Sequence, residues 1–207
     1  MRDDELHVPR LDAVLVTHSD NDHYSVPTCR DLASVTAAYH STRYVASLMD
    51  QERLPAHGHG IGDTFAVGDV RVTITPADHA WQNESPGASE HVFAPDDACG
   101  FWLETPDGII WAPGDSRLIP DHHLQMPAPD AMLFDFSDSE WHFGLDGAIT
   151  MANAYPDTPL LLHHWGCVDA PDFPPFNGNP QDVYDRVTNP GRVQLLAPGQ
   201  PYVLSRL

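Results

Sequence analysis

Lysine is absent from this sequence. Ten arginines are set against thirty aspartates and glutamates, so the 207-residue chain carries a formal net charge of −20. Such an acidic surface repels the phosphate backbone of nucleic acids and the anionic face of a membrane, so we expect neither as a partner. The acidity itself is typical of a solvated surface that favours solubility, and it says nothing about the fold.

Cysteines and long apolar runs are also scarce. Cys29, Cys99 and Cys167 are far apart and form no Cys-x-x-Cys pair, which argues against a disulfide framework or a zinc knuckle. We expect buried free thiols at Cys29 and Cys99, whereas Cys167 follows His164 by three residues, which leaves a role beside a metal open. No apolar stretch has the length of a membrane span, and the acidic N-terminus does not resemble a signal peptide. A cytoplasmic location is predicted.

The rest of the composition predicts one domain over residues 1–207. This length is sufficient to bury a core, and the hydrophobic fraction of 42% is ordinary. Twenty prolines and fourteen glycines are spread along the chain, which indicates many short elements joined by tight turns.

The densest group of ligand-type side chains follows the first apolar segment. Residues 11–16 are rich in β-branched side chains and predict a buried strand. Residues 18–23 then read His-Ser-Asp-Asn-Asp-His. Imidazoles and carboxylates are good ligands for zinc, iron and manganese, and the carboxyl end of a strand is where α/β sheets place their chemistry. Side chains at alternating positions of an extended turn point the same way, so His18, Asp20 and Asp22 could converge while His23 faces a second ion.

Later apolar segments are followed by ligand-type residues in the same way. Two predicted hairpins end just before His79 and at Gly114-Asp115, and an apolar strand runs directly into His163 and His164. Each later instance is a weak signal by itself. Their repetition in four separate segments indicates a single shared site.

Between these segments the pattern predicts further elements. Helices are expected over residues 29–38 with Thr28 as N-cap, 45–54, 145–155 and 182–187. Strands are expected over residues 39–44, 131–136, 193–196 and 202–204. Residues 58–63 predict a turn beside solvent-exposed His57 and His59. Residues 82–98 predict a long loop that shapes substrate access, with Trp81 at its base.

The motifs resemble those of the metallo-β-lactamase superfamily, whose His-x-His-x-Asp-His signature follows a strand ending in Thr. Here Thr17 precedes the motif, and Gly114-Asp115-Ser116 is similar to the family's Gly-Asp-Thr. His164-Trp165 resembles the last ligand segment of the branch that includes ascorbate-6-phosphate lactonase and N-acyl phosphatidylethanolamine-hydrolysing phospholipase D. The resemblance covers nearly the whole chain and implies an α/β fold, the αββα sandwich.

The resemblance also implies ligands for two divalent metal ions. One ion would be held by His18, Asp20 and His79, and the other by Asp22, His23 and His164, with Asp115 bridging them. His163 is then a neighbour of the last ligand. Three protein ligands and a bridge leave room for water on each ion, which is typical of a catalytic site.

The chain departs from the family pattern in two places. Asp20 stands where the second His is usual, and this harder ligand favours manganese or iron over zinc. If Asp20 does not reach, the first site is weak or empty and the enzyme is mononuclear. The strands that normally precede the motif are missing, which predicts a fragment or a sheet completed by a second subunit in a homo-oligomer.

The function implied is metal-dependent hydrolysis. Two ions that share a water lower its pKa from about 15.7 towards about 7, which produces a hydroxide nucleophile that Asp22 would orient. His142 is a candidate to protonate the leaving group, although a His flanked by aromatic residues is as often part of a packed core. A small ester, lactone, phosphodiester or amide is expected as substrate. The alternatives are a di-iron redox enzyme of the same fold and a metal-binding scaffold with a degenerate site.

The tryptophans do not decide from the sequence whether the pocket is lined by apolar side chains. Five tryptophans are expected either to line an apolar pocket or to lie in the core, which is the commoner place for them. They are Trp81, Trp102, Trp111, Trp141 and Trp165.

Overall fold

The computed structural model describes residues 8–85, 87–165, 178–197 and 199–204. The strands are β1 (Val14–Leu15), β2 (Tyr39–Thr42), β3 (Ala56–His59), β4 (Thr64–Val67), β5 (Val70–Pro76), β6 (Cys99–Thr105), β7 (Gly108–Ala112), β8 (Ala131–Asp135), β9 (Leu160–His163) and β10 (Val193–Gln194). The helices are α1 (Val26–Leu32), α2 (Arg43–Gln51), α3 (Pro120–His123), α4 (Gly144–Ala154) and α5 (Pro180–Tyr184), with 3-10 helices η2 (Trp81–Glu84) and η4 (Pro190–Arg192).

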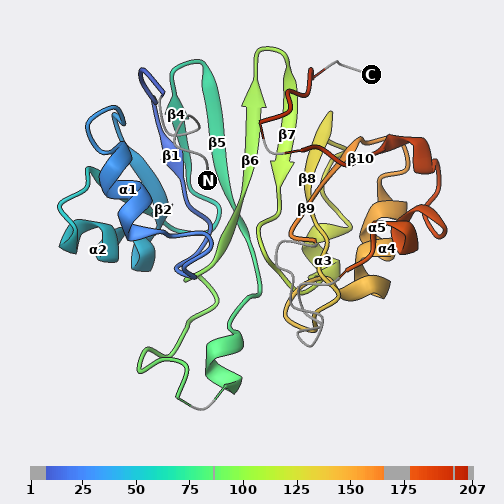
Figure 1. The fold of residues 1–207 in the computed structure, drawn as a ribbon, viewed down its shortest axis with the longest axis horizontal. Coiled ribbons are helices and arrows are strands. Elements are labelled where there is room, and N and C mark those ends of the chain that lie inside the picture. The colour runs from blue at the N-terminus through green and yellow to red at the C-terminus, as the bar shows by residue number, and fades with distance from the viewer. Residues whose placement is uncertain (1–7, 86, 166–177, 198, 205–207) are drawn as a thin grey trace.

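The strands form two sheets between layers of helices (Figure 1). β1, β2 and β3 make a parallel sheet. The larger sheet has the order β10-β9-β8-β7-β6-β5-β4, antiparallel from β4 to β7 and parallel from β7 to β10. α1 and α2 lie outside the smaller sheet, and α4 and α5 lie outside the larger one. The predicted αββα sandwich is therefore confirmed.

Strand direction brings the ends of several strands to one edge. β5 and β7 run the same way because each is antiparallel to β6, and β8 and β9 are parallel to β7. β1 is tied to this edge by a 2.9 Å hydrogen bond from the Cys99 amide to the Thr17 carbonyl. The turns of the β4–β5 and β6–β7 hairpins lie at the opposite end of the molecule from η2 (Figure 1).

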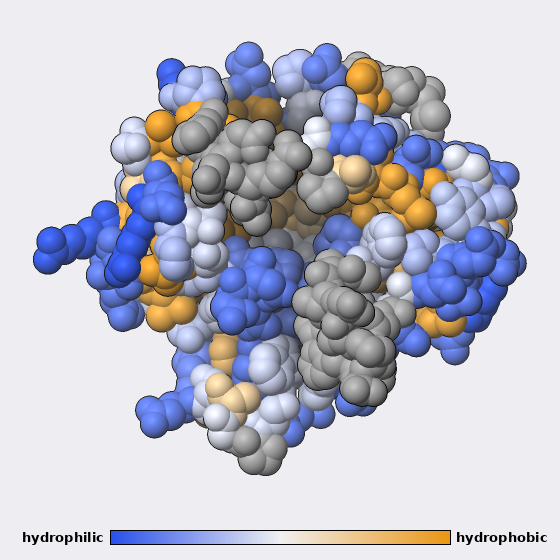
Figure 2. Space-filling view, in the orientation of Figure 1, coloured by the Kyte–Doolittle hydropathy of each residue, from blue (hydrophilic) through white to orange (hydrophobic). Residues whose placement is uncertain are grey.

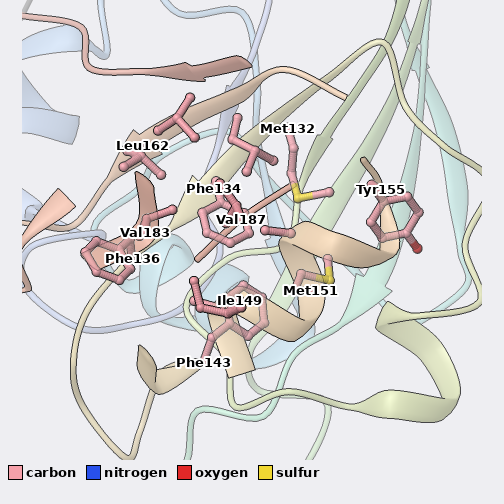
Figure 3. Packing of buried hydrophobic residues seen from close by; sticks show 14 of the residues in the cluster. Met132, Phe134, Phe136, Phe143, Ile149, Met151, Tyr155, Leu162, Val183 and Val187 are labelled. Carbon is pink, nitrogen blue, oxygen red and sulfur yellow. The ribbon is translucent and has the colours of Figure 1, made fainter. Parts of the chain in front are cut away.

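Apolar packing holds the layers together. Met132 and Phe134 of β8 and Leu162 of β9 pack against Ile149 and Met151 of α4 (Figure 3). A second cluster joins α1 and α2 to the smaller sheet, and a third packs part of β1 against β5 and β6. Each fully buried side chain of this kind contributes roughly 1.5–3 kcal/mol, which makes the strand edge a rigid platform.

Local side-chain chemistry decides where the first helix begins. The Ser25 hydroxyl accepts a 3.3 Å hydrogen bond from the Thr28 amide, so Ser25 and not the predicted Thr28 is the N-cap of α1. Pro27 occupies the first turn, where its missing N–H costs nothing. The helix therefore begins earlier than predicted and ends at Leu32, well before Ala38.

Other predictions of secondary structure were wrong in detail. His57 and His59 lie in β3, paired with β2, and not in a turn. His57 is exposed as expected, but His59 is partly buried with its Nε2 3.0 Å from Nδ1 of His40. Residues 202–204 form no strand, and β10 is limited to Val193–Gln194. Glycines disrupt the apolar alternation around β3, so the sequence pattern was too weak to predict it.

Two of the cysteines and the membrane prediction can be compared with the structure. Cys29 and Cys99 are buried free thiols, as predicted, and burial raises the pKa of Cys99 to about 12. Cys167 lies outside the described residues. Among the residues that are described, no helix has both the length and the apolar character needed to cross a membrane. Completion of the smaller sheet by a second subunit stays a prediction.

Candidate metal centre

The four ligand-bearing segments meet at the common strand edge. The motif over residues 18–23 follows β1, and His79 lies three residues after the end of β5. Asp115 lies three residues after β7, and His164 directly follows β9. Because these strands end at the same edge, side chains distant in sequence surround one volume.

One half of the cluster is formed by His18, Asp20 and His79, which we call the inner set. Oδ2 of Asp20 lies 3.6 Å from Nε2 of His18 and 3.4 Å from Nε2 of His79. Nε2 of His18 is also 3.9 Å from Oδ2 of Asp115. The ring nitrogens and the two carboxylates therefore face a common point.

The other half is formed by Asp22, His23 and His164, which we call the outer set. Oδ2 of Asp22 lies 3.8 Å from Nε2 of His23 and 3.4 Å from Nε2 of His164. Oδ2 of Asp115 is closer still, at 2.9 Å from Nε2 of His23 and 3.2 Å from Nε2 of His164. Asp115 thus faces both sets.

The donor atoms fit divalent cations. Nε2 of His18 and Oδ1 of Asp115 are buried without a hydrogen-bond partner among the described residues, which is costly unless a cation satisfies them. The ligand atoms of His18, His79 and Asp115 lie within 4.8 Å of one another, and so do those of the outer set. Imidazole nitrogens and carboxylate oxygens bind zinc, iron and manganese at about 2.0–2.2 Å, so one ion can contact all three residues of either of these groups.

Electrostatics in the outer set favour ion pairs. Burial alone would raise the pKa of Asp115, but hydrogen bonds from His164 and His23 outweigh it and hold that pKa well below its usual range. Burial likewise opposes protonation of His164, yet hydrogen bonds to Asp115 and Asp22 raise its pKa to about 11. Without a metal, protons on the imidazoles therefore supply the positive charge that the carboxylates require.

The inner set differs in the charge of its first imidazole. Burial lowers the pKa of His18, and the Asp20 carboxylate 3.6 Å away only partly offsets it. Burial also acts to raise the pKa of Asp20, but the neighbouring imidazoles of His18 and His79 and the hydrogen bond from Trp81 hold that pKa far below its usual range. A neutral imidazole beside an ionised carboxylate is the protonation state that metal ligands need.

Hydrogen bonds on the far side of the rings orient the imidazoles. The Thr17 hydroxyl oxygen lies 2.9 Å from Nδ1 of His18 and 3.2 Å from Nδ1 of His23. Nδ1 of His79 lies 2.9 Å from the Trp141 carbonyl, to which it donates its proton. Each contact leaves Nε2 free to face the centre, as is usual for metal-binding histidines. Sequence analysis placed Thr17 only as the end of a strand.

Asp20 is held by two side chains from η2. The Trp81 indole N–H donates a 2.7 Å hydrogen bond to Oδ2 of Asp20, and the Gln82 amide donates to Oδ1. Sequence analysis missed both contacts, because about sixty residues separate the partners and no local pattern connects them. The residue that departs from the family signature is therefore anchored from outside the cluster by two side chains of η2.

His142 lies beside the cluster with a buried partner of its own. Its Nδ1 is 2.7 Å from Oδ2 of Asp135, at the end of β8, and its ring centroid is 4.5 Å from that of His164. Sequence analysis singled out His142 but not Asp135. His163 also packs near Asp135, and burial lowers its pKa. Of the two adjacent histidines, His164 lies 3.4 Å from Asp22 and 3.2 Å from Asp115, whereas a ligand atom of His163 lies within 4.8 Å of ligand atoms of Asp115 and Asp135.

The backbone at His164 has an uncommon conformation. Its φ of 60° lies in the left-handed region, which residues other than glycine rarely adopt. Such backbone persists where the surrounding structure enforces it, commonly at functional sites. Here it turns the chain directly after β9, and the imidazole comes to lie against Asp115.

The cluster opens into a cavity of about 1200 Å³. Asp20, Asp22 and Asp115 lie on its inner side, and Trp81 and Trp141 are among its walls. Trp102 and Trp111 belong instead to the hydrophobic core. The face of the molecule shown in Figure 2 has hydrophilic residues around separate apolar patches.

Comparisons with known proteins agree with this geometry. The chain matches the family model described as the Beta-lactamase superfamily domain over residues 1–165. It is 31% identical to a UPF0173 metal-dependent hydrolase of Methanoculleus marisnigri over 91% of this chain and 80% of the relative. It is 28% identical to another of Desulfitobacterium hafniense over 96% and 83% of the two chains.

Two solved structures have a similar fold. Igni18, a metallo hydrolase from Ignicoccus hospitalis, superposes with a TM-score of 0.70 at 18% identity, covering 92% of this chain and 78% of that one. An isothiocyanate hydrolase from Delia radicum gut bacteria gives 0.71 at 14% identity, covering 95% and 78%. The family match, the hydrolase relatives and the shared fold agree with each other, and the chain belongs to the UPF0173 metal-dependent hydrolases of the metallo-β-lactamase superfamily.

Proposed function

We propose that this hydrolase works with two divalent metal ions, one held by the inner set and one by the outer set, with Asp115 shared. The position of Asp115 carries the proposal. Its Oδ2 lies 3.9 Å from Nε2 of His18 in the inner set, and 2.9 Å and 3.2 Å from Nε2 of His23 and His164 in the outer set. A carboxylate that faces both sets fits a bridging ligand.

When bound, two such ions would lower the pKa of a water from about 15.7 towards about 7 and place positive charge beside the scissile group. Asp22 is suited to orient that water. Its side chain is 51% exposed, whereas that of Asp115 is 2% exposed, so Asp22 can accept a hydrogen bond from the cavity.

His142 and Asp135 provide the proposed proton donor. Asp135 accepts the Nδ1 proton of His142, which leaves Nε2 as the ring nitrogen available to a substrate. His142 lines the cavity, and from there it can deliver a proton to the departing oxygen or nitrogen. Asp135 acts through His142 and is a positioning residue.

Asp20 bears on the identity of the metal. A carboxylate in the inner set favours manganese or iron over zinc, relative to an all-histidine set. Iron redox chemistry is the alternative that such a carboxylate suggests, but the relatives are hydrolases, and this favours hydrolysis. Absorption in the visible range by the purified protein would signal a ferric centre.

For the substrate we propose a small ester, lactone, amide or phosphodiester. Support comes from the likeness of His164-Trp165 to the ligand segment of the lactonase and phospholipase branch. A single domain in the cytoplasm, with a second copy of the chain completing the smaller sheet, is the setting that we propose.

Metal analysis of protein purified without added metal tests the centre. We expect two equivalents per chain in the wild type, with a shift towards zinc in Asp20→His. Asp115→Ala and His79→Ala should abolish hydrolysis of an ester, lactone and phosphodiester panel, while Asp69→Ala, on an exposed hairpin turn, should leave it unchanged. Full activity of the metal-stripped protein would refute the proposal.

A further inference from the structure

The cavity has a second wall that the proposed chemistry does not use. About 1200 Å³ is more than the reacting group and two ions fill, and it reaches the size of sites for drug-sized ligands. Tyr44 and Leu48 of α2 line the wall together with Trp81, Phe93 and Trp141. These side chains are apolar or aromatic, whereas the inner side carries carboxylates and imidazoles.

No cationic side chain of Arg or Lys among the described residues lines the cavity. The sequence has no lysine, and every arginine except Arg2 and Arg206 lies in the described residues. The guanidinium of Arg117 lies 4.1 Å over the Trp141 ring, and its Nε donates to the Glu140 carbonyl, so it supports the wall from behind. A phosphate or carboxylate far from the scissile bond would meet no guanidinium or ammonium partner among the described residues, and its desolvation would cost affinity.

The apolar wall is held in shape by its own contacts. Tyr44 stacks on His91 with ring centroids 3.9 Å apart, and Phe93 meets Tyr44 edge-on at 5.6 Å. The side chain of Asn83 holds the backbone of Phe93. Its amide N–H donates a 2.9 Å hydrogen bond to the Phe93 carbonyl, and its Oδ1 accepts a 2.8 Å hydrogen bond from the Phe93 amide. Nε2 of His91 is 2.8 Å from Asp97, so this imidazole is paired within the loop. A preorganised apolar surface binds an apolar group with little ordering cost.

We infer that this wall is a binding subsite for an uncharged alkyl or aryl group of the substrate that does not itself react. The inference rests on the proposed function, because it places the scissile bond at the metal centre. It favours acyl or aryl esters, lactones and amides, and it disfavours substrates with a second anionic group such as sugar phosphates. Each methylene that enters the wall should tighten binding by about fourfold, the ratio that corresponds to ~0.8 kcal/mol.

Alkylhydroxamic acids test the subsite without turnover, because their head group binds metal ions and their tail can be varied. We would titrate the metal-loaded protein calorimetrically with acetohydroxamic, hexanohydroxamic and octanohydroxamic acids. The matched anionic probe is suberic acid monohydroxamate, whose chain has the same length but ends in a carboxylate. We expect affinity to rise along the neutral series and to fall at least tenfold for the anionic probe.

Leu48→Arg places a cation in the wall and should reverse the preference between octanohydroxamic acid and suberic acid monohydroxamate. Gln51→Arg, exposed on the same helix and equal in charge change, is the control and should behave as wild type. Metal content and circular dichroism verify that each variant is folded and loaded with metal. If Leu48→Arg does not fold, Phe93→Ser, on the loop, serves as the second test, and we expect it to lose the dependence of affinity on chain length.

Equal binding of all four probes by the wild type, or tighter binding of the anionic one, would overturn the subsite. A protein that shows the chain-length dependence but hydrolyses no ester, lactone, amide or phosphodiester keeps the subsite and refutes the proposed function. A protein that hydrolyses one of these substrates but shows no chain-length dependence keeps the proposed function and refutes the subsite.

Discussion

The inner and outer sets of the metal centre differ in how they are enclosed. The inner side chains of His18, Asp20 and His79 are 4%, 17% and 4% exposed, and Asp20 is anchored by two side chains from η2. In the outer set Asp22 is 51% exposed and His23 is 20% exposed. Under the proposed function, the enclosed inner set would fix its ion, whereas the outer set would present its ion and Asp22 to the cavity.

Removal of the shared ligand should break both sets and have the largest effect. In Asp115→Ala, the buried rings of His23 and His164 lose their common partner. We expect hydrolysis to fall by about 1000-fold or more, a loss at the upper end for a single electrostatic group, and metal content to drop below one equivalent per chain. Elemental analysis and turnover measure the two effects. Retention of two ions would show that Asp115 does not bridge.

Substitutions at the proton donor should slow turnover and leave both sets filled. In Asp135→Asn and in His142→Ala, we expect kcat to fall about 100-fold with unchanged metal content, because proton transfer contributes about 10²–10⁴-fold. The double variant should be no slower than His142→Ala, since Asp135 acts through His142. A loss of metal in His142→Ala would instead identify it as a ligand, as its grouping with Asp115 and His164 allows.

Loosening of the inner set alone should have a smaller effect. Trp81→Phe and Gln82→Ala each remove one hydrogen bond to Asp20, and loss of such outer contacts typically weakens metal binding by about 10–100-fold. One of the two ions should become easier to remove with a chelator, while the other stays bound. Competition with a fluorescent chelator measures this, and Glu84→Ala, at the exposed end of η2, serves as the control. Equal loss of both ions would contradict the separation of the two sets.

The smallest effect concerns the stability of the metal-free protein. Contacts with Asp115 and Asp22 raise the pKa of His164 from 6.5 to about 11, despite burial. Its protonated form is therefore favoured by folding, so this stabilisation is complete below about pH 6.5 and is lost as the pH rises through about 11. Urea denaturation of the metal-free protein should show lower stability at pH 10 than at pH 7. His164→Gln should lose most of this difference, and an unchanged difference in that variant would refute the assignment.

The strand-then-ligand pattern was readable in the sequence. Short apolar runs before Asp115 and His164 predict strands, and parallel strand ends share an edge by geometry, so a common site followed from local patterns. The αββα sandwich was predicted from the family resemblance. Shorter features were harder to predict from the sequence. The α1 cap depends on a single residue, and β3 depends on pairing with a neighbouring strand.

The sequence by itself determined the chemistry available at the strand edge: which side chains follow which strands, the carboxylate of Asp20 in place of an imidazole, and the absence of lysine. Only the tertiary structure decided how these groups are held. The contacts of Asp20 with Trp81 and Gln82, the Asp135–His142 pair and the 3.2 Å contact of His164 with Asp115 all link residues by side-chain geometry. Hydrogen bonds depend on distances of a few tenths of an ångström, which chain packing sets and local sequence patterns do not encode.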